Sequence, residues 1–236
     1  MNIGSLDAVG RVLEFPRRLV VEPAGVVDDW GRDPGFVRQM IALSQLRWSV
    51  SVGGDQHLPR RQGALIVVNA RRFALAPILA AFAISEAVDR PCRFVGRSDT
   101  APLGPLGRRI GGLLDHPDEV FGALRAGELV VLGAAASTGL RQVGSVGRIK
   151  HEHVGAATAA GVQVYPAATM SSPFGRNARV EIGPATRPSR RRRGPLAELE
   201  LADHLRRQIE QLLDEMGEIR TGTPIDWLPL SGLGGH

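Results

Sequence analysis

The sequence predicts an α/β fold with a mixed, mainly parallel sheet flanked by helices. The apolar run Ala64–Val68 has the continuous hydrophobicity of a strand that is buried on both faces of a parallel sheet. Residues 128–132, Glu-Leu-Val-Val-Leu, are expected to be another buried strand. Segments with helical spacing of their apolar residues lie between such strands. Strands that alternate with helices are typical of α/β architectures.

The first elements are read from periodicity and from turn residues. Residues 35–46 place apolar side chains on one side of a helix. Trp48, Val50 and Val52 then alternate with serines, which predicts a strand that ends at the following glycine pair. Residues 76–87 are apolar enough for a buried helix, and Pro77 suits its first turn.

The last helix, 195–216, has the clearest signal in the second half. Pro195 suits its first turn, and leucine and isoleucine recur at helical spacing from Leu201 onward. Shorter strands are expected at 92–95, 113–114, 162–167 (ending at Pro166) and 178–182, and shorter helices at 118–126 and 155–160.

The chain of 236 residues is long enough for one sizeable domain, which we place at 45–216. This domain includes a basic loop at 187–194 and the helix 195–216. Residues 1–44 are expected to be a loosely packed arm followed by a helix. The Gly/Pro-rich residues 217–236 are expected to be an irregular tail.

Composition narrows the class of partner. The formal net charge is +5, and almost all of the positive charge is arginine, because Lys150 is the one lysine. This balance suits anionic lipid or a membrane surface. Nucleic acid is an unlikely partner, because no recognition motif accompanies the arginines. The one cysteine, Cys92, is expected to be a buried thiol.

The chain lacks an apolar run long enough to span a membrane and has no signal-peptide pattern at its N-terminus. We therefore expect a cytoplasmic protein that can associate peripherally with the cytoplasmic face of the membrane.

From about residue 45 to residue 186, the order of segments resembles the phospholipid/glycerol acyltransferase family. No single segment is specific, but their order and spacing over about 140 residues are. The resemblance implies a glycerol-phosphate acyltransferase-like fold. The segments that carry it are Trp48–Gly54, Leu58-Pro59, Gly63–Asn69, Phe94–Arg97, Pro105–Gly107, Gly112–Asp115, Ala123–Glu128, Ala160–Val162, Val164–Pro166 and Val180–Pro184.

The polar motifs of that family are absent at the matching positions. Its first motif is Asn-His-x4-Asp, in which the histidine is the general base and the aspartate orients it. Here Asn69 is followed by Ala70, and the aspartate position holds Leu75, or Ala76 if the loop is one residue longer. The glutamate of the family's Phe-Pro-Glu-Gly-Thr-Arg motif falls on Ala135. Of the four motifs, only the last is retained, at Pro166.

Polar residues near these positions are the candidates for substrate contact. They are Asn69, Arg71, Arg72, His116 and Ser137, with His116 in the place of a phosphate-binding arginine. Arg71 and Arg72 are equally well explained as a solvated basic loop. A second basic set, Arg187, Arg190, Arg191, Arg192 and Arg193, is either an anion or membrane patch or a solvated loop.

Two functions follow from this pattern. The first is a non-catalytic acyltransferase-like protein that binds lipid, an acyl carrier, or a partner such as an active acyltransferase or another lipid-synthesis enzyme. The second is an active acyltransferase that moves an acyl group from acyl-CoA or acyl carrier protein to a lysolipid or glycolipid acceptor with a relocated base. The candidate bases are His57, His116, His151 and His153. Neither function calls for a metal or another cofactor, because histidines at i and i+2 without a third ligand are a weak metal signal.

Overall fold

The computed structural model describes residues 27–70, 75–135, 146–171, 176–186 and 194–217. In chain order the elements are α1 (Pro34–Arg47), β1 (Ser49–Gly53), the 3-10 turn η1 (Asp55–His57), β2 (Ala64–Ala70), α2 (Ala76–Ala87), β3 (Cys92–Val95), α3 (Leu103–Arg109), β4 (Gly112–Leu113), α4 (Pro117–Arg125), β5 (Leu129–Ala135), α5 (His151–Ala160), β6 (Gln163–Ser171), β7 (Asn177–Ile182) and α6 (Pro195–Glu215).

The described strands form one sheet of seven in the order β1-β7-β6-β2-β5-β3-β4. Every neighbouring pair in this sheet is parallel except β6 and β7, which are antiparallel. This arrangement confirms the predicted α/β class with a mixed, mainly parallel sheet. We call the edge at which β2, β5 and β6 end the carboxyl edge of the sheet.

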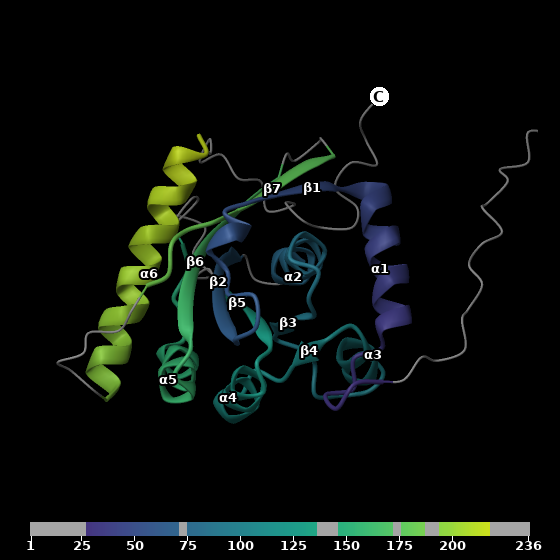
Figure 1. Cartoon of the computed structure of the whole chain (residues 1–236), viewed down its shortest axis with the longest axis horizontal. Helices are drawn as coiled ribbons and strands as arrows, with labels where there is room; N and C mark the ends of the chain where they lie inside the picture. The colour runs from purple at the N-terminus through teal and green to yellow at the C-terminus, as the bar shows by residue number, and fades with distance from the viewer. Residues whose placement is uncertain (1–26, 71–74, 136–145, 172–175, 187–193, 218–236) are drawn as a thin grey trace, which may run out of the picture.

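Strand β2 is the centre of the sheet. Residues Ala64–Val68 are fully buried, as the continuous apolar run predicted, because β5 and β6 pair with the strand on either side and helices cover both faces. Figure 1 shows α4, α5 and α6 on one side of the sheet and α2, with α1 beside it, on the other.

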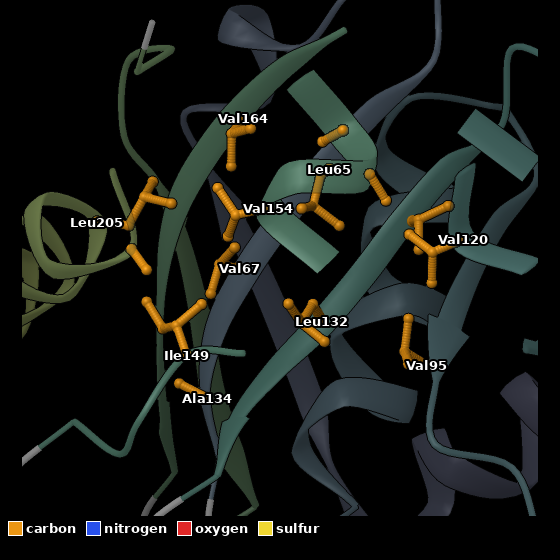
Figure 2. Packing of buried hydrophobic residues seen from close by; sticks show 14 of the residues in the cluster. Leu65, Val67, Val95, Val120, Leu132, Ala134, Ile149, Val154, Val164 and Leu205 are labelled. Atoms are coloured by element: carbon orange, nitrogen blue, oxygen red, sulfur yellow. The ribbon is translucent and has the colours of Figure 1, made fainter. Parts of the chain in front are cut away.

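The larger hydrophobic cluster lies under α4, α5 and α6. Figure 2 shows side chains from these helices, Val120, Val154 and Leu205, directed toward strand residues such as Leu65 and Leu132. On the opposite face, α2 packs on the sheet through Ala80, Ala81 and Ile84. Burying this apolar surface is the main favourable contribution to folding. It also holds the ends of β2, β5 and α2 in fixed relative positions.

Strand β6 continues to Ser171 and does not end at Pro166 as the sequence predicted. A proline ends a central strand when its missing N–H would leave a ladder bond unmade. Here Pro166 lies between the bridge that joins Val164 to Thr186 and the β6–β7 ladder, which starts at Ala167. The carbonyl oxygen of Pro166 accepts a hydrogen bond from Gly183 N at 2.8 Å. The strand therefore continues beyond Pro166 without leaving this carbonyl group unpaired.

Two helices differ from the expectation. Helix α3 was not predicted, because its sequence Leu-Gly-Pro-Leu-Gly-Arg-Arg holds two glycines and a proline. Helix α5 begins at His151, four residues earlier than predicted, so the segment His151–His153 forms its first turn.

Residues 27–33 contact the domain through two aspartate side chains, Asp28 and Asp33. Asp28 accepts hydrogen bonds from the backbone N–H groups of Trp30 and Arg32 at 3.0 and 2.9 Å. It also pairs with the buried Arg93 of β3, with Oδ2 2.6 Å from Nη2. Asp33 caps α1 and accepts a 2.7 Å hydrogen bond from Arg109. Arg109 and the N–H of the first helical turn hold the pKa of Asp33 below its usual value.

Candidate functional site

The candidate site lies at the carboxyl edge, where β2 and β5 end side by side. The register of these strands pairs Ala70 with Ala135. A Cβ atom placed on Gly133 would lie 3.0 Å from the Cβ of Ala70 and 2.9 Å from Cγ of Pro77. The ends of the two strands and the first turn of α2 are therefore in close contact.

Leu75 is the N-cap residue of α2, and the helix has no side-chain cap at this end. Aspartate is a preferred N-cap residue, because its carboxylate accepts a backbone N–H of the first turn. Leu75 instead packs with the apolar cluster of Val37, Trp48 and Phe82. Ala70, Leu75 and Ala135 are thus brought to one edge of the sheet, and neither alanine nor leucine is a titratable residue type.

Asn69 joins β2 to β6 beyond their last regular pair, Val68 and Ala167. Its Nδ2 donates to Thr169 O at 2.9 Å, and its Oδ1 accepts from Thr169 N at 2.5 Å. The hydroxyl of Thr169, a residue only 2% exposed, donates in turn to the carbonyl oxygen of Asn69 at 3.1 Å. Both polar atoms of the Asn69 side chain are therefore used inside the sheet. No local pattern predicts this pairing, because the two residues are 100 positions apart.

His116 follows β4 at the same edge and is the N-cap residue of α4. Its Nδ1 accepts a long hydrogen bond of 3.4 Å from Asp118 N, and its side chain is 63% exposed. Strands β5 and β3 lie between β4 and β2, so His116 is displaced sideways from Asn69 by about 14 Å at the usual strand spacing. The structure does not bring His116 together with Asn69.

His153 lies in the first turn of α5 and is 2% exposed. Its Nε2 is 3.0 Å from Oδ1 of Asp115, and the ammonium group of Lys150 contacts the other oxygen of that carboxylate. Burial lowers the pKa of His153, and the nearby Asp115 carboxylate offsets part of that effect. These contacts join the start of α5 to the turn before α4. Sequence reasoning singled out His153 but missed Asp115 and Lys150 as its neighbours.

The other two candidate bases lie apart from Ala70. His57 is in η1, with Nδ1 2.9 Å from the carbonyl oxygen of Ile182 at the end of β7, two strands away from β2. His151 is partly exposed on α5, and its Nδ1 is 3.4 Å from the Glu152 carboxylate.

Several predicted site residues lie outside the described residues. They are Arg71, Arg72, Ser137, Arg187, Arg190, Arg191, Arg192 and Arg193. Among the residues that are described, no group of three or more His, Cys, Asp and Glu side chains could hold a metal ion. No helix within the same ranges is long and apolar enough to cross a membrane.

Comparison with known proteins identifies the fold. No protein-family model matches the sequence, and no curated protein matches it at a significant level. Among solved structures, the chain is similar to the crystal structure of the 1-acyl-sn-glycerophosphate (LPA) acyltransferase PlsC from Thermotoga maritima. The match has a TM-score of 0.55 and 15% sequence identity, and it covers 78% of this chain and 80% of that one. The fold thus resembles that of an acyltransferase of lipid metabolism.

Proposed function

We propose that this chain is a non-catalytic acyltransferase-like protein that acts by binding a lipid, an acyl carrier or a partner enzyme. The observation that carries the proposal is the pairing of Ala70 with Ala135 in register at the carboxyl edge. In the family that the sequence resembles, a general base and a glutamate stand at the matching positions of its motifs. A methyl group can neither accept a proton nor interact with a charge that develops during acyl transfer.

The expected loss of activity is large. A general base contributes a factor of about 100 to 10,000 in rate. Removing several groups that act together costs up to about a million-fold. Leu75 adds to this loss, because a side chain packed with Val37 and Trp48 cannot orient a base.

The packing and the basic residues around this edge support the proposed binding of a ligand. Strands β2 and β5 and the start of α2 are in close contact there. Arg71 and Arg72 follow Ala70 directly in the sequence. Two guanidinium groups at this point favour a ligand with a phosphate, such as an anionic lipid or the phosphate of an acyl carrier.

The competing function is an active acyltransferase with a relocated base. The contact of 3.0 Å between His153 and Asp115 favours it, since a carboxylate beside a histidine is the arrangement that orients a general base. Two observations weigh against it. The imidazole of His153 is almost completely buried, and Lys150 neutralises the same carboxylate.

Binding and turnover should be measured separately with acyl-CoA and a panel of lysophospholipids. Ala70→Trp would fill the candidate site, and Ala159→Trp, at an exposed position on α5, is the matched control. We expect ligand binding without turnover, with binding lost in Ala70→Trp and kept in Ala159→Trp. Turnover that disappears in His153→Gln would establish the competing function instead. Absence of both binding and turnover would leave a partner enzyme as the ligand.

A further inference from the structure

A groove of about 580 Å³ lies between α1 and the C-terminal half of α2. The candidate site described above is at the other end of α2, which is about 18 Å long at 1.5 Å per residue. The groove is within the size range of small-molecule sites. Its apolar lining comes from Pro34, Val37, Ile41, Ala42 and Pro91, and its charged lining from Arg32, Arg38, Glu86, Asp89 and Arg90.

Arg32 is the residue of this groove whose surroundings favour a bound anion. It is 8% exposed, and its Nε is buried without a hydrogen-bond partner. No ion pair or hydrogen bond joins its guanidinium to another side chain in the part of the chain that the structure describes. The carboxylates of Asp28 and Glu128 are near, but Arg93 takes both, at 2.6 and 3.3 Å.

A buried charge without a partner is costly, because the desolvation of the ion is not repaid. Burial and the neighbouring Arg93 accordingly lower the pKa of Arg32. A guanidinium offers a planar set of N–H donors that matches the two oxygens of a carboxylate. An anion in the groove would compensate this charge at the part of Arg32 that lines the groove.

Two other charged groups of the groove already have partners. Arg90 donates to the carbonyl oxygens of Pro59, Gln62 and Gly127, so it holds three loop segments together. Glu86 accepts from the side-chain amide of Gln45 at 3.2 Å. The five charged residues that line the groove are three arginines and two acids, so the lining itself is more basic than acidic.

We propose that this groove binds a small monocarboxylate with an apolar body, held by Arg32 at its carboxylate and by the apolar side chains of α1 along its length. The guanidinium of Arg32 suits a carboxylate, and the walls of Val37, Ile41 and Ala42 suit a hydrocarbon group. The proposal concerns a different end of α2 from the candidate site and does not depend on acyl transfer.

The first test is the thermal stability of the full chain with hexanoate, with hexanol and with inorganic phosphate. Hexanoate has both the negative charge and the apolar body, hexanol has only the apolar body, and phosphate has only the negative charge. We expect hexanoate at a hundred-fold excess over its Kd to raise the Tm by about 5 °C, and the other probes to have much smaller effects. A shift with phosphate alone, or no shift with hexanoate, would overturn the proposal.

Two variants test whether Arg32 binds the carboxylate. Arg32→Met keeps the stem and removes the charge, and Arg60→Met, at an exposed position outside the groove, is the control. A binding role predicts that Arg32→Met abolishes the hexanoate shift and raises the Tm of the ligand-free protein, because an unpaired buried charge is removed. A lower ligand-free Tm would overturn the proposal, since it would make Arg32 a structural partner of Asp28 and Glu128.

A second variant keeps Arg32 intact and serves if Arg32→Met does not fold. Ala42 lies on the exposed side of α1 and lines the groove, so Ala42→Trp would fill it. We expect this variant to fold and to lose the hexanoate shift. A shift of unchanged size would overturn the proposal.

Discussion

Asn69→Ala should destabilise the protein, because the Asn69 side chain is used as a connector between β2 and β6. The change removes the amide that donates to Thr169 O at 2.9 Å and the oxygen that accepts from Thr169 N. The hydroxyl of Thr169 keeps its bond to the Asn69 carbonyl. The backbone N–H and C=O of Thr169, a residue 2% exposed, are therefore the groups that lose partners.

The magnitude follows from these two groups. Each buried polar group left without a partner costs about 1–3 kcal/mol, so we expect a loss of about 3 kcal/mol in the free energy of unfolding. For a chain of this length, that loss corresponds to a decrease of about 6–12 °C in Tm. Asn69→Asp should cost at least as much, because it keeps the acceptor but places a carboxylate oxygen against Thr169 O.

Urea unfolding followed by circular dichroism measures the change, with Asn177→Ala at the exposed start of β7 as the matched control. A loss below about 1 kcal/mol, together with loss of lysophospholipid binding, would refute this reasoning. Asn69 would then be a substrate-binding residue, as the sequence alone suggested.

Three further predictions test other parts of the structure. Gly54 and Gly161 share a φ of +73°, but a Cβ on Gly54 would lie 2.0 Å from Ile182 O, whereas a Cβ on Gly161 would meet no atom within 4 Å. Gly161→Ala should therefore lower the free energy of unfolding by about 1 kcal/mol, and Gly54→Ala should lower it clearly more. Equal losses in the two variants would contradict the packing of Gly54 against Ile182. Because burial holds the pKa of His153 below its ordinary value of 6.5, the unfolded chain binds that proton first. The contribution of neutral His153 to the free energy of unfolding should be fully present above about pH 7 and should be lost as the pH falls through 6.5 toward the folded-state pKa. Urea unfolding at several pH values should show a smaller decline in His153→Gln than in the unmodified protein. An identical pH profile in the two proteins would contradict this. Burial raises the pKa of the Cys92 thiol to about 12, so a thiol reagent at pH 8 should label it only after unfolding, and rapid labelling of the native protein would be inconsistent with its position in β3.

Much of the fold could be predicted because burial leaves a direct trace in sequence. A strand covered on both faces must be apolar at successive positions, and the runs at Ala64–Val68 and Leu129–Leu132 show this pattern. The glycines and proline of α3 hid a helix, because local propensity argues against one there. Tertiary context also decided the course of β6, since the partner strands leave a gap where Pro166 lacks its N–H.

The candidate site was only partly predictable. The order of segments placed Ala70 and Ala135 at strand ends, and register then brought them together. Contacts between distant residues had no sequence signal. The hydrogen bonds between Asn69 and Thr169 and the contacts of Asp115 with His153 and Lys150 arise only when the sheet and helices assemble. The same is true of the buried Arg32 Nε, which has no hydrogen-bond partner among the described residues.

We propose that the carboxyl edge around Ala70 and Ala135 does not support acyl transfer. A single-turnover reaction tests it most directly, with labelled acyl-CoA and lysophosphatidate mixed with an excess of protein so that even one slow cycle is detected. We expect no product above that of a heat-denatured control, even when the ligands bind. Product that forms with the native protein, and that is lost in His153→Gln, would contradict it.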